Sequence, residues 1–203
     1  TSCFHHNGSF CKFLKVCIPS MLLQIPQLPF QPLFPHLPGL KTHHFHHHVP
    51  KQIPIGPLLG DRILVLHGSL TKEDVLNTLI DRLAQVEGMV PHDDLAWGIF
   101  HRESLMSTGI GNGIAVPHVR LENIDSPSMA LAVCPDGVSD YQSPDNQPVK
   151  LVFMVVAGGQ QRATHLKILA SIGSLFYDGR LKAAFLASPD PKNCQEILAR
   201  AEA

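Results

Sequence analysis

The sequence predicts a layered α/β domain with a central mixed β-sheet flanked by helices, preceded by an N-terminal extension rich in proline and histidine. The domain is predicted because short apolar runs, typical of buried strands, interleave with amphipathic helical segments from Leu58 onward. The extension differs because its prolines recur at positions 26, 29, 32, 35 and 38, a spacing that excludes helix and central strand. We therefore divide the 203 residues into an extension, 1–57, which we expect to be disordered, and a domain, 58–203.

The extension also contains the tract THHFHHHVP. Clustered imidazoles can bind zinc, nickel or copper, so metal binding by this tract is one functional hypothesis. We favour the alternative, a tail with incidental metal affinity. Residues 10–23 have two lysines before an apolar run, but prolines follow closely and no small-residue cleavage site is clear. We therefore do not interpret them as a signal sequence.

The charge and cysteine content narrow the class of protein. The chain has 16 basic and 17 acidic residues, a balance that argues against a protein built to coat nucleic acid or an anionic membrane. Because no stretch reaches about 18 uncharged apolar residues, we expect no transmembrane helix. The five cysteines are odd in number and unevenly spaced, which is atypical of a disulfide scaffold and favours a reducing, cytoplasmic location.

The first elements of the domain are a strand and two helices. The apolar run RILVLHG is a predicted strand that ends at Gly68, and residues 71–86 form a predicted amphipathic helix with Thr71 as N-cap and Asp74 at the capping-box position. Its apolar face consists of Val75, Leu76, Leu79, Ile80, Leu83 and Val86. Pro91 and the acidic residues after it favour a second helix over 91–105, whose core-facing residues we expect to be Leu95, Trp97 and Ile99.

The rest of the domain alternates strands and helices. Buried strands are predicted for the apolar runs GIAVPH, SMALAVC and VKLVFMVVA. A helix is predicted over 163–178, followed by shorter helices at 180–188 and 194–203. The predicted core face of the first of these helices consists of Leu166, Leu169, Ile172, Leu175 and Phe176.

The stretch STGIGNGIAVPHVRL is the first candidate for a functional site. Its three glycines permit a tight turn that could bring backbone N–H groups close to an anion. A dinucleotide fingerprint needs a strand, then glycines, then a helix, whereas the order here is helix, glycines, strand. The Gly-Lys-Ser/Thr of a Walker A loop is also absent. Nucleotide binding is therefore poorly supported.

His118 closes the strand that follows these glycines. A neutral imidazole is a competent nucleophile near physiological pH, so this histidine is a candidate catalytic residue. Taken alone, a histidine in such a place is more often a structural residue that forms a hydrogen bond to a turn. The isolated residue leaves both interpretations open.

The longer segment RESLMSTGIGNGIAVPH closely resembles the phosphorylation-site motif of the enzyme IIA domains of the bacterial phosphotransferase system. The resemblance is to the fructose–mannitol type, which includes the nitrogen-regulatory IIA proteins. It continues through DNQPVKLVFMVVA and ATHLKILASI and covers about residues 59–203. By this resemblance the chain is a phosphocarrier, and His118 accepts a phosphoryl group from a phosphohistidine on HPr or its nitrogen-branch relative. His165 and Arg102 match the second histidine and the arginine of the family's active site.

The resemblance also implies how such a site works. Phosphoryl transfer between imidazoles requires positioning and compensation of the charge on the phosphoryl oxygens. Arg102 and His165 are expected to supply part of this, and the N–H groups of a phosphoryl loop the rest. We assign that loop to Gly109, Gly111, Asn112 and Gly113. No metal and no cofactor are needed.

The implied partners are the HPr-like donor and either an acceptor IIB domain or a regulatory target, with no nucleic acid and no insertion into a membrane. Between sugar transport and regulation we favour regulation, because TGIGNGIAVPH looks closest to the nitrogen branch. The alternative is a binding module that keeps the IIA fold without phosphorylation. Val119 departs from the small residue, often glycine, that commonly follows the family's Pro-His, and we expect its bulk to lie close to the phosphoryl site. The turn AGGQQRATHL also departs from the pattern, and both changes put donor specificity in doubt.

Overall fold

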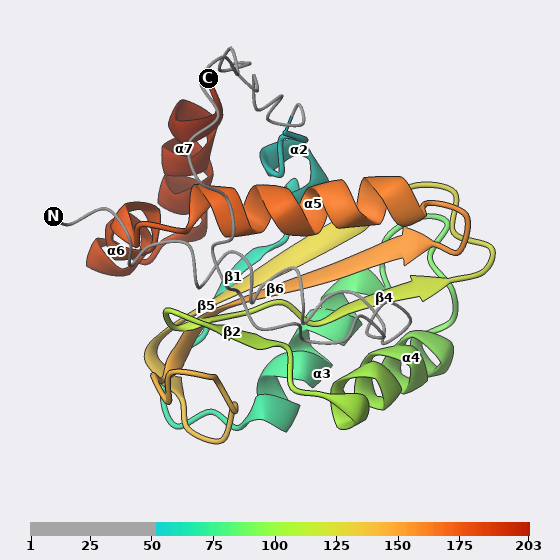
Figure 1. Cartoon of the computed structure of the whole chain (residues 1–203), viewed down its shortest axis with the longest axis horizontal. Coiled ribbons are helices and arrows are strands. Elements are labelled where there is room, and N and C mark those ends of the chain that lie inside the picture. The colour runs from blue at the N-terminus through green and yellow to red at the C-terminus, as the bar shows by residue number, and fades with distance from the viewer. Residues whose placement is uncertain (1–51) are drawn as a thin grey trace, which may run out of the picture.

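The computed structural model describes residues 52–203. The histidine-rich tract, its proposed metal binding and the expected disorder of residues 1–51 therefore lie outside the described residues. In the described part, a twisted sheet lies between two layers of helices (Figure 1). The predicted α/β class with a central mixed sheet is confirmed. No helix among residues 52–203 is long and apolar enough to cross a membrane.

The sheet has six strands in the order β1-β5-β6-β3-β2, and β4 also pairs with β6. The strands are β1 (Ile63–Val65), β2 (Gly109–Gly111), β3 (Ile114–Ala115), β4 (His118–Leu121), β5 (Ser128–Val138) and β6 (Val149–Gly158). Strand β5 runs antiparallel to β6, whereas β3 and β4 run parallel to it. Strands β3 and β4 share one register on β6, so they act as one strand interrupted at Val116 and Pro117.

Helices cover both faces of the sheet, and each face has its own apolar core. The helices are α2 (Gly56–Leu59), α3 (Lys72–Leu83), α4 (His92–Leu105), α5 (Arg162–Leu175), α6 (Arg180–Ala187) and α7 (Pro191–Glu202). Helices α3 and α4 pack on one face, and α2, α5, α6 and α7 pack on the other (Figure 1). Because side chains alternate along a strand, Phe153 and Val155 of β6 join the α5 core whereas Val152 and Met154 join the α3–α4 core.

The predicted capping box at the start of α3 is confirmed. The hydroxyl of Thr71 accepts a hydrogen bond from the N–H of Asp74 at 3.1 Å, and the Asp74 carboxylate accepts the N–H of Thr71 at 3.0 Å. A helix start leaves four N–H groups without a partner inside the helix, and a capping box satisfies two donors there. The predicted apolar face is buried from Val75 to Leu83, which fixes α3 on the sheet.

Two core predictions are wrong. The side chain of Trp97 is 68% exposed, because the inward face of α4 is formed by Leu95, Ile99 and Glu103. Leu166 is 37% exposed, because its neighbour His165 takes the inward position at that turn of α5. In both helices a polar residue occupies part of the inner face. Apolar periodicity alone therefore predicted the wrong rotation of each helix about its own axis.

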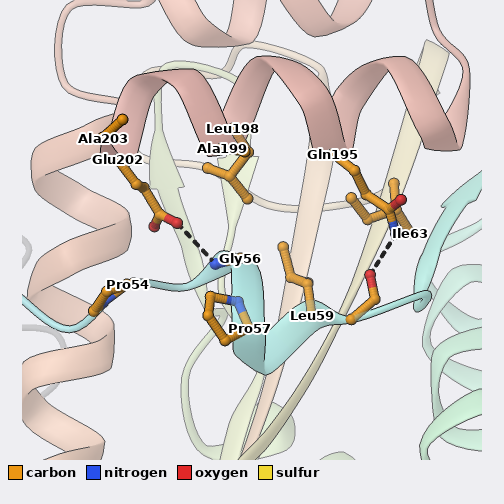
Figure 2. Close-up of a pocket in the computed structure, with 11 residues that line it drawn as sticks. Pro54, Gly56, Pro57, Leu59, Ile63, Gln195, Leu198, Ala199, Glu202 and Ala203 are labelled. Carbon is orange, nitrogen blue, oxygen red and sulfur yellow. Dashed lines mark hydrogen bonds between the residues drawn. The ribbon is translucent and has the colours of Figure 1, made fainter.

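Residues 53–57, which the sequence analysis placed in the extension, pack against the domain. Ile55 is fully buried in the α5 core. The carboxylate of Glu202, in the last turn of α7, accepts the N–H groups of Ile55 at 2.6 Å and Gly56 at 3.1 Å. Figure 2 shows the hydrogen bond between Glu202 and Gly56 beside the groove between α2 and α7. The two prolines in this short segment leave no periodicity from which its burial could be predicted.

We expect Thr71→Ala to lower the free energy of unfolding by about 1 kcal/mol, because it removes the side-chain acceptor at the start of α3. Urea denaturation followed by circular dichroism measures this loss. The matched control is Thr78→Ala in the same helix, where the hydroxyl donates only to the carbonyl of Asp74. That control should change stability by no more than roughly 0.5 kcal/mol. Equal losses in the two variants would contradict a specific role for the cap.

Candidate functional site

Two buried histidines meet between the sheet and α5. His118 begins β4, and His165 lies in the first turn of α5. Their ring centroids are 5.2 Å apart and the ring planes are inclined by 83°, an edge-to-face arrangement. The side chains are 8% and 5% exposed, respectively. The structure thus brings together the two histidines that the sequence analysis had singled out.

A backbone carbonyl fixes the tautomer of His118. Nδ1 of His118 lies 2.7 Å from the carbonyl oxygen of Val116. A carbonyl can only accept a hydrogen bond, so Nδ1 carries the hydrogen. In the neutral ring this leaves the lone pair on Nε2. The Val116 carbonyl is not used by β6, because the N–H of Val155 donates to the carbonyl of Pro117 at 2.9 Å.

Both imidazoles are held in the neutral form at physiological pH. Burial lowers the pKa of His118 to about 4, the Val116 hydrogen bond opposes this change, and the positive charge of Arg102 adds to it. Burial also lowers the pKa of His165 to about 3, with smaller contributions from His118, Arg120 and Arg102. Nδ1 of His165 is buried and has no hydrogen-bond partner among residues 52–203.

Two guanidinium groups act on this pair of rings. Arg102 lies in the last turn of α4 and donates from Nη1 to the carbonyl of Met106 at 3.0 Å. Arg120 lies two residues after His118 on β4 and donates from Nη1 to the carbonyl of Gly159 at 3.2 Å. Arg120 was not among the site residues predicted from the sequence. The signal that could have found it is the spacing of two, which places both side chains on the same face of a strand.

Val119 lies on the opposite face of β4 from His118. Its Cγ2 and the Cδ2 of Leu121 are each 3.1 Å from the point where a Cβ on Gly98 of α4 would lie. Both side chains belong to the α3–α4 core, whereas His118 faces α5. The expectation that Val119 adds bulk beside the phosphoryl site is therefore wrong, because alternation along the strand turns this side chain to the other face.

The glycine turn lies at the other end of the sheet from the histidines. Asn112 and Gly113, both with positive φ (55° and 69°), form the tip of the β2–β3 hairpin. Ile114, next to this tip, pairs with Leu151 of β6, whereas His118 pairs with Val155. Four residues of strand separate these two positions by about 13 Å.

The contacts of the hairpin tip lead away from the histidines. The N–H of Asn112 donates to Asp145 at 2.6 Å, and its side chain donates to the carbonyl of Phe176, at the end of α5 opposite His165, at 3.3 Å. Lys182 donates to the Asn112 carbonyl at 2.6 Å. Gly109, at the start of the hairpin, lies against the backbone of Gln142. The structure therefore does not bring the tip of the predicted phosphoryl loop to the histidine pair.

The arrangement can present one unprotonated ring nitrogen beside two fixed positive charges. A neutral imidazole is a nucleophile, and guanidinium groups bind phosphate and carboxylate oxygens. This combination suits the transfer of an anionic group to His118. Among residues 52–203, no cluster of three or more histidine, cysteine or acidic side chains could hold a metal ion.

Comparison with known proteins gives one family. Residues 58–201 match the family model described as phosphoenolpyruvate-dependent sugar phosphotransferase system, EIIA 2. The chain is 30% identical over 130 residues to the PTS system fructose-specific EIIA component of Haloferax volcanii, an alignment that covers 64% of this chain and 83% of that protein. It is 35% identical over 118 residues to the PTS system fructose-specific EIIABC component of Bacillus subtilis, covering 58% of this chain and only 18% of that protein.

A solved structure agrees with this relationship. The nitrogen regulatory protein IIA-Ntr from Neisseria meningitidis superposes with a TM-score of 0.64 at 26% identity, covering 71% of this chain and 98% of that one. Relatives named for fructose and for nitrogen regulation thus both match this chain.

The depressed pKa values predict an ordered titration of the histidines. In NMR spectra of the side-chain nitrogens, His118 and His165 should stay neutral from pH 8 to pH 5, since their pKa values are about 4 and 3. His92 is the internal control: hydrogen bonds to Asp93 and Asp81 raise its pKa above 6.5, so it should gain its proton first. Protonation of His118 with a midpoint near 6.5 would contradict the buried, neutral site.

Proposed function

The chain belongs to the phosphoenolpyruvate-dependent sugar phosphotransferase system EIIA 2 family, and from this premise we propose that it is a phosphocarrier whose phosphorylated residue is His118. The donor in this proposal is a phosphohistidine on an HPr-like carrier protein. The observation that carries the proposal is the hydrogen bond of 2.7 Å between Nδ1 of His118 and the Val116 carbonyl. It leaves Nε2 as the nitrogen that can act as a nucleophile.

The proposed step exchanges one phosphorus–nitrogen bond for another. The lone pair of Nε2 attacks phosphorus while the bond to the donor imidazole breaks, and the donor nitrogen keeps the electron pair. Nδ1 of His118 keeps its hydrogen throughout, so no base is needed to remove a proton before the attack. The ring then carries positive charge, and the Val116 carbonyl stabilises that charge because it already accepts from Nδ1.

Charge on the transferred phosphoryl group is compensated by the side chains around the ring. Arg102 and Arg120 approach from different elements, and each is held by a hydrogen bond to a backbone carbonyl. Guanidinium groups preorganised in this way stabilise a phosphoryl transition state without reorganising during the reaction. His165, whose buried Nδ1 lacks a partner among the described residues, supplies a further polar atom next to His118.

The proposal includes two alternative roles, which differ in what happens to the phosphoryl group after it reaches His118. A transport component passes the group to a IIB domain, whereas a regulator binds its target in only one phosphorylation state. Relatives named for fructose transport and for nitrogen regulation match this chain to a similar degree. We favour the regulatory role on the resemblance of the TGIGNGIAVPH segment. Transfer of labelled phosphate from the phosphorylated chain to purified IIB domains separates the two roles.

Incubation with phosphoenolpyruvate, enzyme I and HPr should add one phosphate, detected as a shift in intact mass and localised to His118. The variant His118→Ala should show no shift. The matched control is His67→Ala, which removes an exposed histidine next to Asp136 and should be labelled like the wild type. Labelling of His118→Ala at the wild-type rate would refute the assignment.

Loss of either guanidinium should slow the same reaction without abolishing it. We expect Arg102→Gln and Arg120→Gln each to reduce the rate of phosphorylation on the order of 10- to 100-fold, since each removes one charge that faces the phosphoryl oxygens. Rapid-quench kinetics with phosphorylated HPr measures the rate. Arg200→Gln, which removes an exposed arginine paired with Glu196 on α7, is the matched control and should react normally. A normal rate in Arg120→Gln would remove this residue from the site.

A further inference from the structure

Glu103 is the one acidic side chain that is buried among residues 52–203, with 5% of its surface exposed. It follows Arg102 in the last turn of α4. A helix C-terminus is a poor place for a negative charge because the helix dipole points its negative end there. A buried carboxylate also costs free energy unless charged or hydrogen-bonded partners compensate for it. The position therefore requires an explanation, and the partners of this carboxylate provide one.

Three groups satisfy the Glu103 carboxylate. Lys72, at the start of α3, lies 2.7 Å from Oε1. The N–H of Thr108 donates to Oε1 and Oε2 at 3.1 and 3.3 Å, and the Thr108 hydroxyl donates to Oε2 at 2.6 Å. Because that hydroxyl hydrogen is used, the contact of 2.9 Å between Thr108 and Tyr141 has the phenol as donor. Burial raises the pKa of Tyr141, which keeps the phenol protonated for this role.

This cluster connects directly to the ring of His118. The carbonyl of Thr108 accepts the N–H of Val116 at 3.0 Å. The carbonyl of Val116 in turn accepts Nδ1–H of His118 at 2.7 Å. Val116, whose carbonyl selects the tautomer of His118, is thus held at its own N–H by Thr108, and Thr108 is itself held by Glu103. Thr108 directly precedes β2, so this hydrogen bond extends the antiparallel pairing of β2 with β3 by one residue, from Gly109 and Ala115 to Thr108 and Val116.

We propose that Glu103 is a positioning residue for the phosphoryl-transfer site: through Thr108 and Val116 it holds His118 in the tautomer that leaves Nε2 free. The inference rests on the proposed phosphorylation of His118. Glu103 touches neither the ring nor the transferred group, so its effect is exerted through the backbone of Thr108 and Val116. Lys72 alone would balance the charge of Glu103. The hydrogen bonds from Thr108 to the carboxylate are therefore the contacts that connect Glu103 to His118.

The variant Glu103→Gln tests the inference in the full chain. The amide keeps the shape of the side chain, but it loses the attraction to Lys72 and places an NH₂ donor where one carboxylate oxygen accepted. We expect the Nδ1–H tautomer of His118 to lose population in long-range nitrogen–proton NMR spectra. Phosphorylation by phosphorylated HPr should slow on the order of 10- to 100-fold, the penalty that small misplacements of catalytic groups carry.

The matched control is Asp145→Asn, the same chemical change in a carboxylate that holds the far end of the same hairpin through the N–H of Asn112. It should leave both the tautomer and the rate of phosphorylation unchanged. A folded Glu103→Gln with the wild-type rate would overturn the inference. So would a slow Glu103→Gln whose His118 tautomer is unchanged, because its effect would then not pass through Val116.

Two further measurements keep the test decisive. If Glu103→Gln does not fold, Thr108→Val removes only the hydroxyl, and it should shift the tautomer and the rate in the same direction; a wild-type tautomer and rate would overturn the inference. The NMR measurement needs no phosphate donor. If the wild type is not phosphorylated, the proposed function fails, and the tautomer populations in Glu103→Gln and Asp145→Asn still decide whether Glu103 positions His118.

Discussion

Strand β6 is the element on which the rest of the structure depends. It pairs with β5 on one side and with β3 and β4 on the other, and its residues are buried on both faces. A strand of this kind leaves no freedom in register, because a slip of one residue would exchange its two cores. The register of β6 therefore fixes where β4 begins, and His118 is the first residue of β4. The location of His118 therefore follows from the packing of the two apolar cores on either side of β6, which involve many more residues than the site does.

The interruption between β3 and β4 supplies the backbone groups that orient His118 at the candidate site. Pro117 removes one ladder N–H, and Val116 turns its N–H to Thr108 and its carbonyl to His118. The two-residue period of β4 then sorts the following side chains. His118 and Arg120 face α5, whereas Val119 and Leu121 face Gly98 on α4. One strand thus contributes both to the site and to the opposite core, which explains why a bulky valine beside the histidine is tolerated.

Much of this could be predicted from the sequence, but not all of it. Strands β1, β3, β5 and β6, the capping box at Thr71 and the inner face of α3 follow from local patterns of apolar and capping residues. Trp97 and Leu166 were placed wrongly because Glu103 and His165 occupy inward positions, and periodicity counts only apolar residues. The distance of the Asn112–Gly113 turn from His118 depends on pairing with β6, which is a long-range contact that no local pattern contains.

The charge of each group at the candidate site is determined by its burial and by its charged neighbours. In the resting state both histidines are neutral because they are buried, so the positive charge that acts on the two rings comes from Arg102 and Arg120. A protonated His118 would be repelled by Arg102 and would have no lone pair to offer. The imidazoles are buried, whereas Arg120 is exposed and Arg102 is half-buried, so the guanidinium groups are accessible to an anion that arrives from solvent. Glu103 carries a negative charge that Lys72 and Thr108 hold in place. This charge stabilises the His118 ring once the ring becomes positive. Burial, tautomer and charge thus all support the proposed transfer of a phosphoryl group from an external donor to Nε2.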